Sequence, residues 1–138
     1  MFRYVVASCC VLYSASAAAE PSKLSGEAIK EIVAGAVLEV DTPLGLKVPL
    51  RYSEDGRVNG EARGLAYILG SQSDTGKWWV SSDRLCHKWT KWFDGVLQCL
   101  RISQEGSRIF WRRDDGETGT AVISKRASVV AKAPKDLD

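Results

Sequence analysis

Residues 96–124, VLQCLRISQEGSRIFWRRDDGETGTAVIS, contain three short, largely apolar segments separated by two turn-forming sequences. The segments are residues 96–102, 108–112 and 120–124, and each turn-forming sequence contains an acidic residue followed by glycine. Short apolar runs bounded by Glu-Gly or Asp-Gly pairs are typical of β-hairpins. This stretch therefore predicts three consecutive antiparallel strands.

The same pattern extends toward the N-terminus. Further short segments alternate with turn-forming sequences, and they comprise residues 37–40, 47–52, 58–63 and 77–80. Strands at a spacing of about 8–12 residues indicate an all-β fold, either a small antiparallel barrel or meander, or a sandwich. Because open sheet edges favour aggregation, we expect closure into a barrel of about seven or eight strands.

One short N-terminal helix is predicted over residues 25–34. Ser25 is suited to cap its N-terminus, and Glu27 lies in the first turn, where the helix dipole favours an acidic side chain. Ile29 and Ile32 repeat at helical spacing, and Gly35 is a typical C-terminal stop.

The first nineteen residues resemble a cleaved signal peptide. Arg3 gives a positive start, residues 5–13 are apolar but too short to span a bilayer, and small residues end the segment at Ala17-Ala18-Ala19. We expect a single β-domain over residues 20–126, a flexible tail over 127–138, and no membrane insertion after cleavage. The expected location is the periplasm or the extracellular space.

The charge balance argues against nucleic acid as a partner. The formal net charge is +2, and removal of the signal peptide would take away Arg3 and no acidic residue. Dedicated nucleic-acid binders usually carry a strong basic excess.

Two cysteines, Cys86 and Cys99, remain once the signal peptide is removed. In an exported protein they predict one structural disulfide, which would stabilise a loop of this length by about 3 kcal/mol. The alternatives are a metal site and redox chemistry. A metal site lacks partners because His87 is the only histidine, and the redox spacing Cys-x-x-Cys is absent.

The segment from Cys86 to Trp92 is harder to place. If Asp94-Gly95 formed a two-residue hairpin turn, Cys86 would face Ser103 and lie too far from Cys99 for a disulfide. Either the turn lies elsewhere, or this segment is an irregular loop held by the disulfide. Its many polar residues favour the loop.

Five tryptophans are the clearest compositional excess: Trp78, Trp79, Trp89, Trp92 and Trp111. They either fill the core or form an aromatic binding surface. Adjacent Trp78 and Trp79 must point to opposite faces of a shared strand. In the predicted loop, Trp89 and Trp92 lie beside cationic side chains, a combination found at protein interfaces. The candidate binding residues are therefore His87, Lys88, Trp89, Lys91 and Trp92.

A longer pattern, Gly76-x-Trp78 … Asp83-x-Leu85-Cys86-x-x-Trp89 … Cys99 … Phe110 … Gly116, follows a Leu-x-Gly-x-x-Ile sequence that begins at Leu24. It resembles a family of small exported alphaproteobacterial proteins known only as a domain of unknown function. The resemblance covers most of the chain after the signal peptide and implies a secreted, disulfide-bonded β-domain. The architecture is also similar to that of small periplasmic barrels that inhibit lysozyme or proteases.

No catalytic or cofactor motif accompanies these residues. His87 lacks the sequence contexts that mark hydrolases and metalloproteases, and the acidic residues around Gly116 lack the spacing of a calcium loop. We therefore expect a non-enzymatic binding protein without a cofactor. It would engage an envelope or extracellular protein, including as an inhibitor; the alternative is a carrier of an apolar or saccharide ligand in the barrel mouth.

Overall fold

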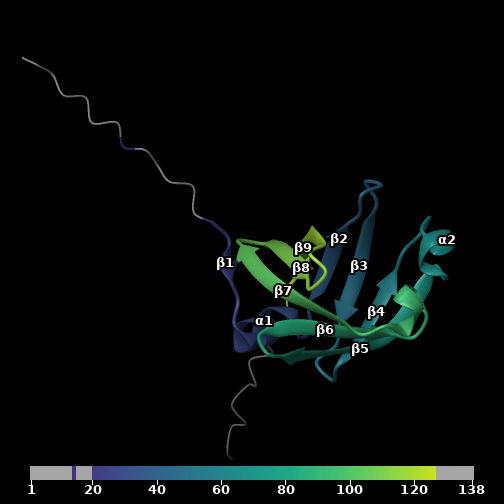
Figure 1. Cartoon of the computed structure of the whole chain (residues 1–138), viewed down its shortest axis with the longest axis horizontal. Coiled ribbons are helices and arrows are strands. Elements are labelled where there is room, and N and C mark those ends of the chain that lie inside the picture. The colour runs from purple at the N-terminus through teal and green to yellow at the C-terminus, as the bar shows by residue number, and fades with distance from the viewer. Residues whose placement is uncertain (1–13, 15–19, 127–138) are drawn as a thin grey trace, which may run out of the picture.

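The structure, a computed structural model, describes Ser14 and residues 20–126. The predicted signal peptide, apart from Ser14, and the predicted tail lie outside the described residues. Nine strands form one antiparallel sheet, and eight of them close into a barrel in which each strand pairs with the next along the chain (Figure 1). The predicted all-β fold, the small barrel and the N-terminal helix are therefore confirmed.

The eight strands of the barrel are β2 to β9. In chain order they are β2 (Val37–Asp41), β3 (Lys47–Tyr52), β4 (Arg57–Glu61), β5 (Ser73–Ser81), β6 (Arg84–Trp89), β7 (Gln98–Glu105), β8 (Arg108–Arg113) and β9 (Thr118–Lys125). Pairing of β2 with β9 closes the barrel. The ninth strand, β1 (Ser22–Lys23), pairs with the C-terminal part of β7, beyond the part that pairs with β6.

Helix α1 (Gly26–Val33) packs against β5 and β6 at one end of the barrel. Ser25 caps it as predicted, because the side-chain oxygen accepts a hydrogen bond from the backbone N–H of Ala28 at 3.3 Å. Ile29 and Val33 on its inner face are buried in the main core cluster. Gly35 follows the helix with φ 78°, the left-handed conformation that favours glycine. The helix thus covers one end of the barrel, here called the helix end.

The opposite end carries the longer connections and is here called the loop end. The β4–β5 connection contains the short helix α2 (Ala66–Leu69), and the β6–β7 connection contains the short 3₁₀ segment η1 (Trp92–Gly95). Neither element was predicted from the sequence. Figure 1 shows α2 on the right, on the other side of the barrel from α1.

The prediction of an irregular loop from Cys86 to Trp92 is wrong. Residues up to Trp89 belong to β6, which pairs with β5 on one side and with β7 on the other. The connection between β6 and β7 spans residues 90–97 and is longer than a two-residue turn at Asp94-Gly95. The register therefore places Cys86 directly opposite Cys99. The two sulfur atoms are bonded, as predicted, across a sequence separation of 13 residues.

Candidate functional site

The strand β6 places the predicted binding residues on two different faces. Leu85, His87 and Trp89 are buried inside the barrel, whereas Lys88 between them is exposed on its outer surface. This is the period of two that a strand imposes on its side chains. The prediction that His87 and Trp89 lie on the surface is therefore wrong.

His87 pairs with a tyrosine in the interior. The hydroxyl of Tyr52 lies 2.7 Å from Nε2 of His87, and both side chains are buried. Burial lowers the pKa of His87 to about 4 and raises the pKa of Tyr52, because the charged form of each is poorly solvated there. The imidazole is also stacked on the ring of Trp89. His87 is thus a neutral core residue with a hydrogen-bonded partner.

Trp92 is also buried, with only 2% of its surface exposed, and this too contradicts the predicted surface patch. The ring centroids of Trp92 and Trp89 lie 4.7 Å apart, and the indole N–H of Trp92 donates to the carbonyl oxygen of Ser71 at 2.9 Å. The ring fills the space where Gly60 has no side chain: a Cβ on Gly60 would lie 2.3 Å from Cζ3 of Trp92. Trp92 therefore occupies the interior at the loop end.

The β6–β7 connection is held in place by Asp74 on β5. Oδ2 of Asp74 accepts hydrogen bonds from the backbone N–H groups of Lys91 at 2.7 Å and Trp92 at 2.8 Å, and Oδ1 accepts one from Thr75. Burial alone would raise the pKa of Asp74, but these three backbone donors outweigh it and hold the pKa below its usual value. A negatively charged carboxylate thus fixes the start of this connection.

Beyond Trp92, the connection adopts a costly backbone conformation. Phe93 and Asp94 both have left-handed backbone angles, with φ of 54° and 55°. For a bulky aromatic residue such a conformation costs about 1–3 kcal/mol and persists only where surrounding contacts enforce it. The anchored residues Lys91 and Trp92 provide that constraint. As a result, Phe93 is directed away from the core and is 42% exposed.

Exposed apolar side chains gather on three connections of the loop end. They are Leu44 and Leu46 between β2 and β3, Tyr67 and Ile68 on α2, and Phe93, Val96 and Leu97 between β6 and β7. Among the described residues, the other large apolar side chain with comparable exposure is Trp79, which lies on the outer surface of β5. We call the seven loop residues the apolar rim.

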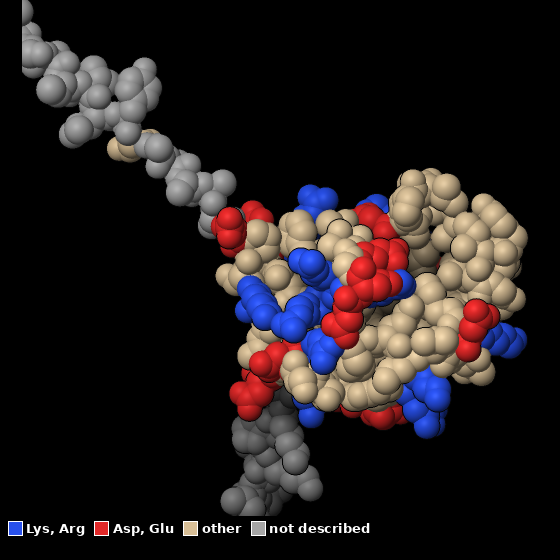
Figure 2. Space-filling model, in the orientation of Figure 1, with Lys and Arg blue, Asp and Glu red and all other residues tan. Residues whose placement is uncertain are grey.

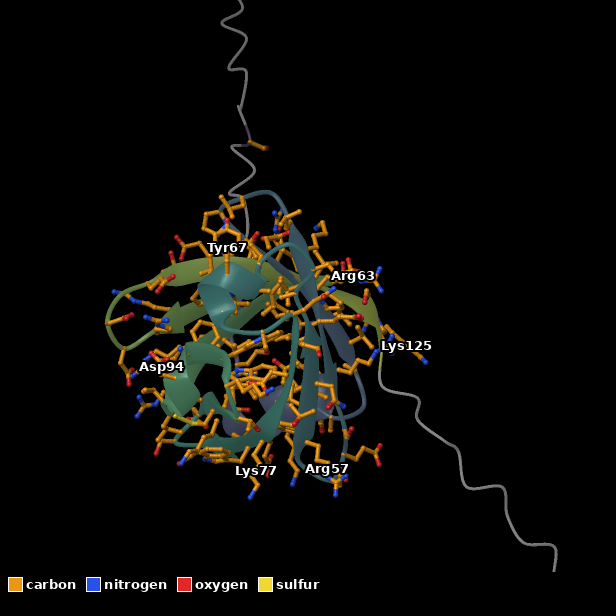
Figure 3. The ribbon with its side chains drawn as sticks, turned by 90° about the vertical axis from the view of Figure 1, so that its right-hand side faces the viewer. Arg57, Arg63, Tyr67, Lys77, Asp94 and Lys125 are labelled. Carbon is orange, nitrogen blue, oxygen red and sulfur yellow. A yellow bond between two sulfur atoms is a disulfide. The ribbon has the colours of Figure 1, made fainter. Side chains whose placement is uncertain are left out.

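Contacts between the connections bring the rim together. The β2–β3 and β4–β5 connections meet where a Cβ on Gly64 would lie 3.5 Å from Cδ1 of Leu46. The β4–β5 and β6–β7 connections meet where the indole N–H of Trp92 donates to the carbonyl oxygen of Ser71. Figure 3 looks onto this end, where Tyr67 and Asp94 lie on two neighbouring connections that face the viewer. Tyr67 is the most exposed member, at 79%.

The five predicted site residues therefore lie in two different environments. Lys88 and Lys91 are exposed and line two adjoining hollows on the outer barrel surface, which share Asn59, Thr75 and Thr90, whereas the other three members are in the core. The tryptophans behave as the core alternative predicts, with Trp78 buried and its neighbour Trp79 37% exposed. The apolar rim was missed, although Leu-Gly-Leu at 44–46 and Tyr-Ile at 67–68 are unusually apolar for surface connections.

No group of three or more metal-ligating side chains occurs among the described residues. In the same part of the chain, no helix has the length and hydropathy needed to cross a bilayer. Comparisons with protein families, with curated proteins and with solved structures found no match to this chain. The resemblance noted in the sequence thus remains a prediction.

Proposed function

We propose that this protein is an exported, non-enzymatic binding protein that engages another envelope or extracellular protein through the apolar rim. The observation that carries the proposal is the concentration of exposed apolar side chains on three connections at one end of the barrel. Exposed apolar side chains gathered at one end of a small domain mark an interaction site, since complete burial of such a side chain gains up to about 1.5–3 kcal/mol. Aromatic side chains such as Tyr67 and Phe93 are frequent anchors of interfaces.

The backbone around the rim supports this proposal. Asp74 bonds the backbone of the two residues before Phe93, so the backbone that leads to this exposed ring is ordered before any partner binds. Side chains that are already ordered lose less conformational entropy on association, and this raises affinity. The backbone cost at Phe93 is consistent with a functional position, because strained residues cluster at binding sites.

The interior gives less support to a carrier. Large buried side chains occupy the barrel, among them Tyr52, Trp78, His87, Trp89 and Trp92. The hollows at Lys88 and Lys91 lie on the outer surface. A carrier needs an apolar internal cavity of about 300–1,000 Å³, and these side chains occupy the volume that such a ligand would need.

The proposal is tested by comparing two variants of the oxidised domain. Tyr67→Ser with Phe93→Ser removes the two aromatic residues of the rim, and Trp79→Ser removes an exposed aromatic residue outside it. Each protein is used for affinity capture from envelope extract, and captured candidates are then purified and titrated. Lysozyme and a secreted protease are the first purified partners to test, because of the architectural similarity noted above.

We expect wild type and Trp79→Ser to bind the same partner, and the rim variant to bind it at least tenfold more weakly, as for loss of hot-spot residues. Urea denaturation of all three checks that the rim variant remains folded. Equal binding by all three proteins would rule out the rim as the interface. If the wild type self-associates with increasing concentration in sedimentation experiments and the rim variant does not, the rim instead joins two copies of this chain.

A further inference from the structure

The outer face of β7 and β8 carries cationic side chains opposite one another. Arg101 on β7 is the direct cross-strand partner of Arg112 on β8, and both are exposed. Like charges at directly opposed positions destabilise an antiparallel sheet. The repulsion between Arg101 and Arg112 therefore suggests that these side chains are retained for an interaction with an anion.

The acidic residues that follow β8 in the chain are bonded to other arginines. Asp114 bonds to Arg84, and Arg113 bonds to both Asp115 and Glu117. Within the described part of the chain, Arg101 and Arg112 take part in no ion pair. Figure 2 shows Lys and Arg side chains gathered on the left of the view, where Figure 1 places β1 and β7, with acidic side chains beside them.

The strand register arranges the neighbouring side chains in two parallel rows. One row runs across four strands through Lys23, Ser103, Phe110 and Thr120, and the adjacent row runs through Arg101, Arg112 and Thr118. Because positions two apart on a strand share a face, both rows lie on the outer surface. Together they line a hollow of about 400 Å³.

We propose that this hollow binds a saccharide that carries a phosphate or sulfate ester. The planar guanidinium groups of Arg101 and Arg112 can each donate two parallel hydrogen bonds to such an ester, and Lys23 adds a third positive charge beside them. Cζ of Arg108 lies over one face of the partly exposed Phe110 ring, 5.9 Å from the ring centroid, so the ring offers its other face to the sugar. The hydroxyl groups of Ser103 and Thr118 can bond the hydroxyl groups of the ligand, whereas the hydroxyl of Thr120 already donates to Oδ2 of Asp41 at 2.7 Å and can act only as an acceptor for the ligand.

The limited extent of the positive surface defines the size of the ligand. Outside the hollow, acidic and basic side chains are mixed, and the whole chain has a formal net charge of only +2. A long polyanion would therefore meet carboxylates such as that of Asp41 beyond the cations of the hollow and the neighbouring Arg108. The site favours a ligand with one or two ester groups, and it is separate from the apolar rim.

The test is an NMR titration of the oxidised domain at low salt. The probes are glucose 6-phosphate, glucose 6-sulfate, inorganic phosphate, inorganic sulfate and unmodified glucose. The test variant is Arg101→Gln with Arg112→Gln. The control variant, Arg57→Gln with Arg63→Gln, removes the same charge from two exposed arginines on or beside β4 that already have acidic partners.

We expect at least one ester to shift resonances of β7 and β8, with at least tenfold weaker binding by the test variant and unchanged binding by the control. The ester that binds with the higher affinity shows whether the site prefers a phosphate or a sulfate group. The proposal fails if glucose binds equally well, if inorganic ions bind as tightly as the esters, if no probe binds, or if the control loses as much affinity as the test variant.

Stability provides a second measurement that does not depend on choosing the right probe. Relief of the Arg101–Arg112 repulsion should make the test variant unfold at a higher urea concentration than wild type. Unfolding at a lower concentration would show that the arginines are retained because they stabilise the sheet, and this would overturn the proposal.

Discussion

Replacing Asp74 with asparagine should loosen the β6–β7 connection without changing its shape. In the wild type, the carboxylate accepts hydrogen bonds from the backbone N–H groups of Thr75, Lys91 and Trp92. Asparagine retains one oxygen, which can still accept from Lys91 and Trp92, but its amide group cannot accept from Thr75.

The expected loss follows from these bonds. A hydrogen bond to a charged group contributes about 1.5–3 kcal/mol and a neutral one about 0.5–1.5, so two bonds that lose their charge cost about 2–3 kcal/mol. Water can replace the third bond, because Thr75 is exposed. The free energy of unfolding should therefore fall by about 2–4 kcal/mol at pH 7.

The effect should also depend on pH. The pKa of Asp74 in the folded protein is lowered, so its stabilisation is present above the unfolded pKa of about 3.9 and is lost as the pH falls through the folded value. Below that value, wild-type Asp74 is neutral and resembles asparagine. The difference in stability between wild type and variant should thus shrink on the acid side of pH 4.

Urea denaturation followed by tryptophan fluorescence, between pH 7 and pH 2.5, measures both effects. Amide hydrogen exchange at Lys91 and Trp92 reports local loosening directly. Asp55→Asn is the matched control, because asparagine can also accept the hydrogen bond from the backbone N–H of Arg57, and the ion pair of Asp55 with the Arg57 side chain is exposed and contributes little. A loss below about 0.5 kcal/mol, or a difference that does not change with pH, would refute the role of Asp74.

Three further outcomes are expected. Trp92→Ala should lower the free energy of unfolding by about 3–5 kcal/mol, and Trp79→Ala by about 1–2 kcal/mol, in urea titrations, because Trp92 is fully buried whereas Trp79 is 37% exposed; similar losses would contradict this assignment. Replacing Cys86 and Cys99 with serine should cost about 2–4 kcal/mol while the barrel still forms, and free thiols in the native protein would argue against the bond. His87 has its pKa lowered to about 4, so the unfolded state takes up its proton first and stability should fall as the pH drops from about 6.5 toward 4; His87→Gln should flatten this part of the profile, and an unchanged slope would count against it.

The sequence was sufficient for the barrel because its strands are adjacent in the chain. Apart from the β6–β7 hairpin, the hairpins have their own turn signals, such as Glu54-Asp55-Gly56, and closure follows from the need to protect the sheet edges. The short helix was predictable for the same local reason, since Ser25 and Gly35 mark its two ends.

The strand β6 was not predictable by the same means. Its inward-facing His87 is polar, and it is accommodated only because Tyr52, 35 residues away, supplies a hydrogen bond. Its outward-facing Cys86 is nevertheless 1% exposed. Both features hide the alternation of polar and apolar residues, so the segment resembles a loop.

The candidate site could be predicted even less well. Asp74 resembles an ordinary turn residue in Ser-Asp-Thr, and its role depends on backbone groups 17 and 18 residues further along the chain. The apolar rim combines residues from three connections that only the closed barrel places at one end. The apolar character of each connection was visible in the sequence, but their proximity was not.

The barrel also determines how the protein can be attached to a surface. Ser22 pairs with Gln104 near the end of β7, and Lys125 pairs with Val37 at the start of β2. Both ends of the described chain therefore leave the barrel on the side of α1, away from α2 (Figure 1). A tether or fusion partner joined at either position would leave Tyr67 and Phe93 pointing outward, so the domain can be displayed on a sensor or a cell surface in one orientation.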